Sequence, residues 1–267
     1  MSVNCGEDDM NFKTLLAEEN QGIINVIFNR PNANNSINTE MLAEINMVLD
    51  YAEKSPNNKL IVLQGSDKFF CTGMDFKEFS QVADEHQDDK HADLYMQTIR
   101  RFSLIPKIVV TKVEGQVTAG GVGFVAASDY VIATEHAQFS LSEALWGLLP
   151  AMVLPYLIRR VGFQKAYSMT LTTQVVTAEE AYSAHLVDNL TNNPDQAIHR
   201  LWLRLRIINE TTLKHMKEYF RKLWIINNSV EEEAVKVISA LLSDSKTKEN
   251  ITNFVNLNKF PWEKDEI

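Results

Sequence analysis

The sequence predicts an α/β fold with parallel strands that is followed by a helical C-terminal region. Two β–α–β turns follow one another within residues 22–63, near the N-terminus. Beyond residue 194 the pattern changes to one amphipathic helix after another. With 267 residues, of which 45% are hydrophobic and 23% charged, the chain is long enough to bury one large core. We therefore expect a core at 1–194 and a helical region at 195–267.

The first strand is predicted at 22–28, GIINVIF, because β-branched residues dominate this run and an Asn-Arg-Pro turn ends it. After the loop NANNSIN, Thr39 is the expected N-cap of a helix that continues to about Glu53. Its apolar residues recur at helical spacing: Met41, Leu42, Ile45, Val48 and Leu49. A short buried strand, LIVL at 60–63, follows and ends at Gly65. This order is typical of parallel sheets.

The rest of the chain adds two strands and a series of helices. Residues 82–92, VADEHQDDKHA, are acidic, and we interpret them as a mobile surface segment that precedes a helix at 92–104. Pro106 ends that helix, and strands are predicted at 107–113 and 130–134. The C-terminal helices are expected at 195–208, 211–225 and 229–243.

Charge and cysteine content exclude several classes of protein. The chain has 26 Lys and Arg against 35 Asp and Glu, a net charge of −9, which disfavours a nucleic-acid or anionic-membrane partner. Two cysteines, Cys5 and Cys71, form no disulfide framework, and the six histidines lack the spacing of a metal site. The N-terminus resembles no signal peptide, and no apolar run reaches the ~18 residues of a membrane span. We expect a soluble, cytoplasmic protein without a metal.

A cluster of small residues at 119–126, AGGVGFVA, follows a strand and opens a helix. It formally matches the dinucleotide fingerprint, but the acid that ends the next strand, Glu135, lies only twelve residues past Gly123. A nucleotide-binding unit places its acid ~20 residues beyond the glycines, so this function is disfavoured. Two interpretations stay open. Free N–H groups at the helix start bind an anion or a developing oxyanion, or the glycines only permit close packing.

Two other segments carry candidate groups. The loop FFCTGMDF at 69–76 contains Cys71, which we expect to be a small buried residue rather than a nucleophile, because no local histidine would activate it. In the same loop, Asp75 is expected to start a helix or join a polar network. Glu143 stands alone in the apolar run 137–150, where burial favours a raised pKa and proton transfer near neutral pH. A helix-start glutamate bonded to backbone amides is the alternative.

Taken in order, these segments resemble the crotonase (enoyl-CoA hydratase/isomerase) superfamily from about Phe12 to Trp262. The resemblance rests on the NRP turn, NSIN, FCTGMDF, PKIVVTKVEGQVTAGG, DYVIATEHAQFSLSE and GLLP, which occur in the family's order and spacing. It implies a right-handed spiral of ββα turns and a helical C-terminal region that packs trimers. It also implies that the backbone N–H groups of Met74 and Gly120 bind a thioester carbonyl and stabilise its oxygen as charge develops there.

The resemblance also assigns the acid–base residues. Hydratases of the family usually carry two glutamates. The first falls on Gly123 and is therefore absent here, whereas the second falls on Glu143 and is present. The chain thus departs from the two-carboxylate pattern.

The stretch 142–162, together with QKAYSMTLTTQVV and KFPWE, resembles the dehydratases of polyketide β-branching cassettes, which act on 3-hydroxy-3-methylglutaryl groups carried on acyl carrier protein (ACP). This likeness implies elimination of water with Glu143 as base and acid, and no cofactor. The implied substrate and pantetheine residues are Ala33, Ser36, Cys71, Thr72, Gly73, Asp75, Gly121 and Trp146. The alternatives are a CoA-level hydratase or double-bond isomerase, an RNA-binding protein of the same fold, and an inactive scaffold.

The expected partners are an ACP or CoA thioester and further copies of the chain, as a homotrimer or dimer of trimers. Apolar residues of the C-terminal region, among them Leu201, Trp202 and Leu223, favour such an assembly. Basic candidates for ACP contact are Arg100, Arg101, Lys107 and the segment 217–222. Arg159 and Arg160 are candidates for the substrate's distal carboxylate, although a solvent-exposed or subunit contact is the alternative.

Overall fold

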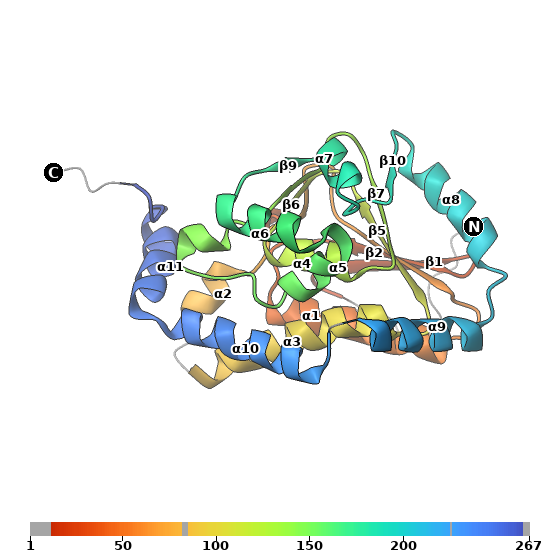
Figure 1. Cartoon of the computed structure of the whole chain (residues 1–267), viewed down its shortest axis with the longest axis horizontal. Coiled ribbons are helices and arrows are strands. Elements are labelled where there is room, and N and C mark those ends of the chain that lie inside the picture. Colours follow the sequence, from red (N-terminus) through yellow and green to blue (C-terminus); the bar gives the residue numbers. More distant parts are fainter. Residues whose placement is uncertain (1–11, 82–84, 225, 264–267) are drawn as a thin grey trace.

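Two β-sheets form the centre of the protein (Figure 1). The computed structural model describes residues 12–81, 85–224 and 226–263, so Cys5 lies outside the described residues. The larger sheet has the order β1 (Leu15–Asn20), β2 (Ile23–Phe28), β3 (Leu60–Gln64), β5 (Ile108–Val113), β7 (Tyr130–Ala133) and β10 (Asn189–Leu190). The smaller sheet has the order β4 (Phe69–Cys71), β6 (Gln116–Thr118), β8 (Gln138–Ser140) and β9 (Val176–Thr177).

Successive turns of the chain repeat the order strand, strand, helix. Strands β3 and β4 are followed by α2 (Phe76–Gln81) and α3 (Glu85–Leu104), and β5 and β6 by α4 (Gly120–Ala127). Strands β7 and β8 are followed by the 3-10 helix η2 (Glu143–Trp146) and by α5 (Leu154–Val161). Equivalent strands pair in parallel, β3 with β5 and β6 with β8. The predicted α/β class and the ββα spiral are confirmed.

The sequence LIVL of strand β3 is an unbroken apolar run because both faces of the strand are covered. Ile61 and Leu63 point into the main core beneath α1 (Thr39–Lys54), α3 and α4, whereas Leu60 and Val62 belong to a second cluster. That cluster includes Trp202 of α8 (Pro194–Leu205) and Leu213 of α9 (Glu210–Leu223). A parallel strand covered on both faces has no solvent side, so every position is apolar.

The C-terminal region is helical, as predicted, and it contains one helix more than the three expected. After α8 and α9 come α10 (Asn228–Ser243) and α11 (Ser245–Leu257). Helix α10 packs along α3, and α11 contacts α2 and η2. In Figure 1, α11 lies at the end of the molecule opposite α8. The region thus reaches from the second core cluster to the loops that follow the strands.

Two predicted helix starts are wrong. The side chain of Asn38, not Thr39, caps α1 by accepting the Met41 N–H over 3.0 Å. Helix α3 begins at Glu85, so most of the segment interpreted as a mobile surface is its first two turns; residues 82–84 lie outside the described residues. Charged residues are compatible with a helix that buries apolar residues on one face, as α3 does with Tyr95 and Ile99.

Several elements were not predicted at all. Strand β1 has the sequence LLAEEN and pairs with β2 at the edge of the larger sheet. Its exposed positions are Leu16, Glu18 and Asn20, so apolar and polar residues do not alternate cleanly along it. The strands of the smaller sheet have two or three residues, too few to show a period of two. The helices α5, α6 (Phe163–Thr172) and α7 (Ala178–Ser183) also lie in a stretch for which no element was proposed.

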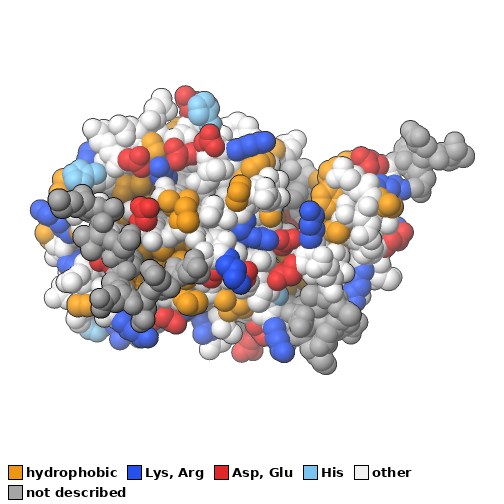
Figure 2. All heavy atoms as spheres, turned by 180° about the vertical axis from the view of Figure 1, so that it is seen from behind, with side chains coloured by type: hydrophobic (Ala, Val, Ile, Leu, Met, Phe, Trp, Pro, Cys, Tyr) orange, Lys and Arg blue, Asp and Glu red, His pale blue; other side chains and the backbone are white. Residues whose placement is uncertain are grey.

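The described surface carries mixed charge. On the face shown in Figure 2, Lys and Arg side chains are interspersed with Asp and Glu. Within the described residues, no helix combines the length and apolarity that a bilayer crossing requires. The same part of the chain contains no group of three or more His, Cys, Asp or Glu side chains placed to hold a metal ion.

Candidate active site

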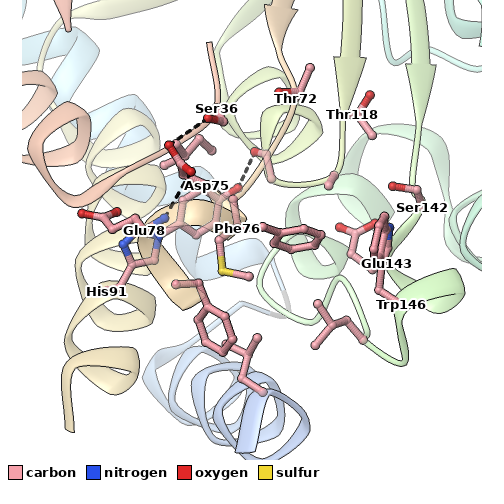
Figure 3. Close-up of a pocket in the computed structure, with 18 of the residues that line it drawn as sticks. Ser36, Thr72, Asp75, Phe76, Glu78, His91, Thr118, Ser142, Glu143 and Trp146 are labelled. Atoms are coloured by element: carbon pink, nitrogen blue, oxygen red, sulfur yellow. Dashed lines mark hydrogen bonds between the residues drawn. The ribbon is translucent and has the colours of Figure 1, made fainter. Parts of the chain in front are cut away.

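A cavity of ≈ 1190 Å³ lies where the loops after β2, β4, β6 and β8 meet the C-terminal helices. Figure 3 shows Ser36, Asp75, Glu78 and His91 on one side and Ser142, Glu143 and Trp146 on the other. Ile238 of α10 and Phe254 of α11 contribute to its wall. The cavity therefore combines polar groups from the spiral with apolar side chains from the C-terminal region.

Two loops approach closely at the cavity because their residues are small. Gly73 has φ +86°, and a Cβ there would lie 2.7 Å from the Ala119 Cβ and 3.2 Å from the Gly120 nitrogen. A Cβ on Gly121 would lie 2.6 Å from the Cys71 carbonyl oxygen. Larger side chains at these positions would separate the loops. The close packing brings the neighbouring residues Met74 and Gly120 to the same part of the cavity wall, which both line.

The backbone at Gly120 is set up as a hydrogen-bond donor. Ala119, at the N-cap of α4, has φ 51° and ψ −123°, a strained conformation for a residue with a side chain. Gly120 is the first residue of α4, and N–H groups in a first turn have no acceptor within the helix. Among the described residues, no acceptor takes the N–H of Gly120. The start of α4 therefore offers a donor and the positive end of a helix dipole.

A network of hydrogen bonds holds the loop that carries Met74. The Ile37 N–H donates to the Gly73 carbonyl over 2.7 Å, and the Asp75 N–H donates to the Ile37 carbonyl over 2.9 Å. These two bonds flank Met74, whose own N–H meets no acceptor within the described residues. Met74 and Gly120 thus both line the cavity, and each has an N–H group without an acceptor among the described residues. Two backbone donors that face one oxygen atom can stabilise an oxyanion.

Asp75 fixes this loop from its other side. Its carboxylate accepts from Arg30 over 2.7 Å and from Ser36 over 3.2 Å, and its second oxygen caps α2 at the Lys77 N–H. Burial acts to raise the pKa of Asp75, but the bonds from Arg30 and from the Glu78 amide outweigh it and lower that pKa. The predicted helix-start role of Asp75 is confirmed.

Glu143 is a buried carboxyl with no ionic partner among the described residues. It opens η2, is 9% exposed and lines the cavity. In the same part of the chain its Oε2 atom has no hydrogen-bond partner, and burial raises the pKa of Glu143 to about 7. A carboxyl with such a pKa exchanges protons readily at neutral pH, as a general base or acid must.

Comparison with known proteins shows which family has this sequence pattern. A sequence model of the enoyl-CoA hydratase/isomerase family matches residues 18–265. The chain belongs to this family.

The individual relatives agree with this assignment. The bacillaene synthase dehydratase PksH of Bacillus subtilis is 34% identical over 261 residues, which cover 96% of this chain and 99% of that protein. A crystal structure of PksH covers 94% of this chain and 100% of its own, with a TM-score of 0.85. The mitochondrial enoyl-CoA hydratase of Pongo abelii is 27% identical over 93% of this chain and 87% of that protein. The protein is thus a crotonase-family enzyme of the hydro-lyase class.

The structure brings together most of the residues that the resemblance implied. Met74, Gly120 and Glu143 line the cavity, as do Ala33, Ser36, Thr72, Asp75 and Trp146. Cys71, Gly73 and Gly121 lie behind the wall and contribute the close packing of the two loops. Burial raises the pKa of the Cys71 thiol to about 12, so this thiol stays protonated and is no nucleophile.

The basic residues proposed for ligand contact lie elsewhere. Arg159 donates to the Ala126 carbonyl over 2.7 Å with its guanidinium over the Trp224 ring, and Arg160 pairs with Asp188 over 2.8 Å. Neither of the two arginines lines the cavity, so the structure does not support them as ligands of a distal carboxylate.

The structure also corrects two of the predicted ACP contacts. Lys107 and Lys217 are buried and pair with Glu210 and Asp129, so neither side chain is available to a partner.

Among the polar residues of the site that sequence reasoning missed are Tyr95 and His91, which α3 contributes to the cavity. His91 is near Thr39, with 3.3 Å between its Nδ1 and the Thr39 Oγ1, and burial lowers its pKa. The Tyr95 hydroxyl donates to the Gly120 carbonyl over 2.6 Å. Both residues lie in α3, whose start the sequence analysis misplaced. The spacing of apolar residues along this helix does not show which of its side chains face the cavity.

Proposed function

We propose that the protein eliminates water from a 3-hydroxy-3-methylglutaryl thioester, carried by ACP, to give a 3-methylglutaconyl thioester. The observation that carries this proposal is that a single cavity is lined by Glu143, a buried carboxyl whose Oε2 atom has no hydrogen-bond partner among the described residues, and by Met74 and Gly120 with their free N–H groups. The 34% identity with PksH, named as a dehydratase of bacillaene synthase, supports the reaction type and its place in polyketide synthesis.

The reaction begins at the thioester carbonyl. Hydrogen bonds from the Met74 and Gly120 N–H groups draw negative charge onto the carbonyl oxygen and so acidify the protons on C2. The Glu143 carboxylate removes one of them, and the C2–H electron pair becomes part of the enolate. These donors stabilise the enolate more than the ground-state carbonyl, and only such differential binding lowers the barrier.

Elimination completes the reaction. The enolate electron pair forms the C2–C3 double bond while the C3–O bond breaks, and the carboxyl of Glu143 returns the proton to the departing hydroxyl as water. The product is a conjugated alkene and the carboxylate is regenerated, so protons and electrons balance. One acid–base group is enough, because the same carboxyl takes and gives the proton.

The other carboxylates of the described cavity wall are engaged in structural contacts. Asp75 is bound by Arg30 and caps α2, and Glu78 accepts the Thr39 N–H over 2.9 Å. This leaves Glu143 as the carboxyl of that wall with a pKa suited to proton transfer. We place the pantetheine arm along Ala33, Ser36 and the loop 71–75, as the family resemblance implies.

The deciding experiment compares three substrates with the purified protein: 3-hydroxy-3-methylglutaryl-ACP, its CoA ester and crotonyl-CoA. Dehydration of the ACP-bound substrate with little hydration of crotonyl-CoA is the expected result. Preferential turnover of crotonyl-CoA would instead assign the hydratase activity for which the mitochondrial relative is named. Absence of turnover on all three would reject both functions.

A further inference from the structure

Tyr95 places a hydroxyl group against the helix that carries one of the two oxyanion donors. It lies on α3, is 3% exposed and lines the cavity. Its ring packs on Phe124 of α4 with 5.6 Å between the ring centroids. Its hydroxyl donates to the Gly120 carbonyl over 2.6 Å, and Gly120 is the first residue of α4. A side chain of one helix therefore holds the first turn of another.

The same hydroxyl explains why residue 123 is a glycine. A Cβ built on Gly123 would overlap the Tyr95 Oη atom, and it would lie 3.2 Å from Tyr95 Cζ and 3.1 Å from Val153 Cγ2. Gly123 is buried in the middle of α4, where glycine costs helix stability relative to alanine. The position therefore keeps glycine because the Tyr95 hydroxyl occupies the space of its side chain.

We propose that Tyr95 is a positioning residue that takes the place of a side chain at 123: its hydroxyl excludes a second carboxylate there and fixes the Gly120 turn for enolate stabilisation. This inference rests on the proposed function. A neutral hydroxyl in this place spares Glu143 a neighbouring negative charge, which would raise its pKa further and hold it protonated at neutral pH. Tyr95 thus determines that the site works with one carboxyl.

Tyr95 takes no part in proton transfer. Burial raises the pKa of its phenol well above the ordinary value, so the group remains neutral and donates a hydrogen bond throughout the reaction. The C2 proton still passes to Glu143 and from there to the leaving hydroxyl. The role of Tyr95 is geometric, and it predicts an effect on kcat rather than on substrate binding.

The first test is a stability cycle that is independent of activity. Gly123→Ala should lower Tm by roughly 3–8 °C, because the added methyl group meets the Tyr95 oxygen. In the Tyr95→Phe background, which lacks that oxygen, the same change should cost little, and the double variant should be more stable than Gly123→Ala alone. Equal losses in both backgrounds would overturn the steric pairing.

The second test is kinetic. Tyr95→Phe should lower kcat about tenfold on the thioester while KM changes less than about twofold, because the lost interaction acts on the transition state. Tyr156→Phe is the matched control: Tyr156 is fully buried, bonds Glu231 over 3.2 Å and does not line the cavity. It should lose stability and keep kcat.

An unchanged kcat in Tyr95→Phe would overturn the positioning role. A wild-type protein that turns over no thioester would reject the proposed function. The stability cycle would then show by itself whether the Tyr95 hydroxyl excludes a side chain at residue 123.

Discussion

Arg30 donates a hydrogen bond to the Asp75 carboxylate over 2.7 Å and thereby joins the turn after β2 to the loop that carries Met74. The two side chains are only 18% and 10% exposed. Arg30 also donates to the backbone carbonyl of Ser36, so three segments meet at one guanidinium. The loop that places the proposed oxyanion donor, the Met74 N–H, is therefore held by a charged contact beside the cavity.

Asp75→Asn should destabilise the protein by about 2–4 kcal/mol at pH 7, because it leaves the largely buried Arg30 guanidinium without its counter-charge. The pKa of Asp75 is lowered in the folded state, so its carboxylate stabilises the fold above the ordinary aspartate pKa and loses that effect as the pH falls further. Urea unfolding at pH 7 and at pH 3 should show a smaller difference between variant and wild type at pH 3. Equal losses at both values would contradict the ionic role.

Glu143→Gln should keep the fold and remove the base. General acid–base contributions are roughly 10²–10⁴-fold, and a single carboxyl that both takes and gives the proton should lie at the upper end. The measurement is the rate of dehydration by the purified variant, with circular dichroism to check folding. Retention of more than about a tenth of the wild-type rate would exclude Glu143 as the base.

Glu143→Gln should lose activity but gain stability at high pH. Because burial raises the folded-state pKa of Glu143 to about 7, the native protein holds this proton more tightly than the unfolded chain between pH 4.5 and 7. Stability is therefore lost as the pH rises through that window, by up to about 3 kcal/mol. Glu143→Gln should match wild type near pH 4.5 and exceed it at pH 8 in urea unfolding. A variant less stable than wild type at pH 8 would show that the carboxylate has a favourable partner.

The carrier should be ACP rather than CoA. The basic side chains among the described residues that line the cavity are Lys77, Lys90 and His91. Lys77 and Lys90 are exposed, so they are our candidates for contact with the carrier. We expect kcat/KM for the ACP-bound substrate to be at least tenfold above that for the CoA ester, a difference of ~1.4 kcal/mol. The advantage should shrink with added salt and in Lys77→Glu/Lys90→Glu, since exposed charges are screened. Equal efficiency on both carriers at low salt would favour a CoA enzyme.

The protein should assemble as a trimer or a dimer of trimers. Ile207, Phe220 and Leu223 of the C-terminal region are 80%, 64% and 65% exposed in the single chain, which favours burial between subunits. Light scattering with size-exclusion chromatography at micromolar concentration gives the mass directly. A particle of 30.4 kDa, the mass of one chain, would contradict the prediction.

The sequence predicted the larger sheet better than the smaller one for a physical reason. The strand β3 is apolar throughout because both of its faces are covered, and such a run is visible in the sequence alone. A three-residue strand such as Gln116–Thr118 shows no pattern, and only the order of motifs in the family resemblance implies the second sheet. The start of α3 was misplaced because acidic residues indicate exposure and do not distinguish a helix from a loop.

For the site, resemblance placed Met74, Gly120 and Glu143, and the structure adds what holds them. For Gly123, the sequence indicated a missing carboxylate and left close packing open as a role for the glycines of 119–126. The steric cause of this glycine, the Tyr95 hydroxyl, comes from a residue 28 positions earlier, and no local pattern links the two. Contacts between side chains on different helices depend on how the helices pack, which spacing within either helix does not reveal.

The wall that α11 gives the cavity has a consequence for the biosynthesis of the enzyme. Phe254 faces the same space as Asn32, and α11 contacts η2, the short helix that begins with Glu143. A ribosome translates the spiral before α11, the helix that completes this part of the cavity wall. The nascent chain can fold its sheets as they emerge, yet its pocket stays open on one side until α11 has left the exit tunnel. The cavity wall is therefore completed late in synthesis.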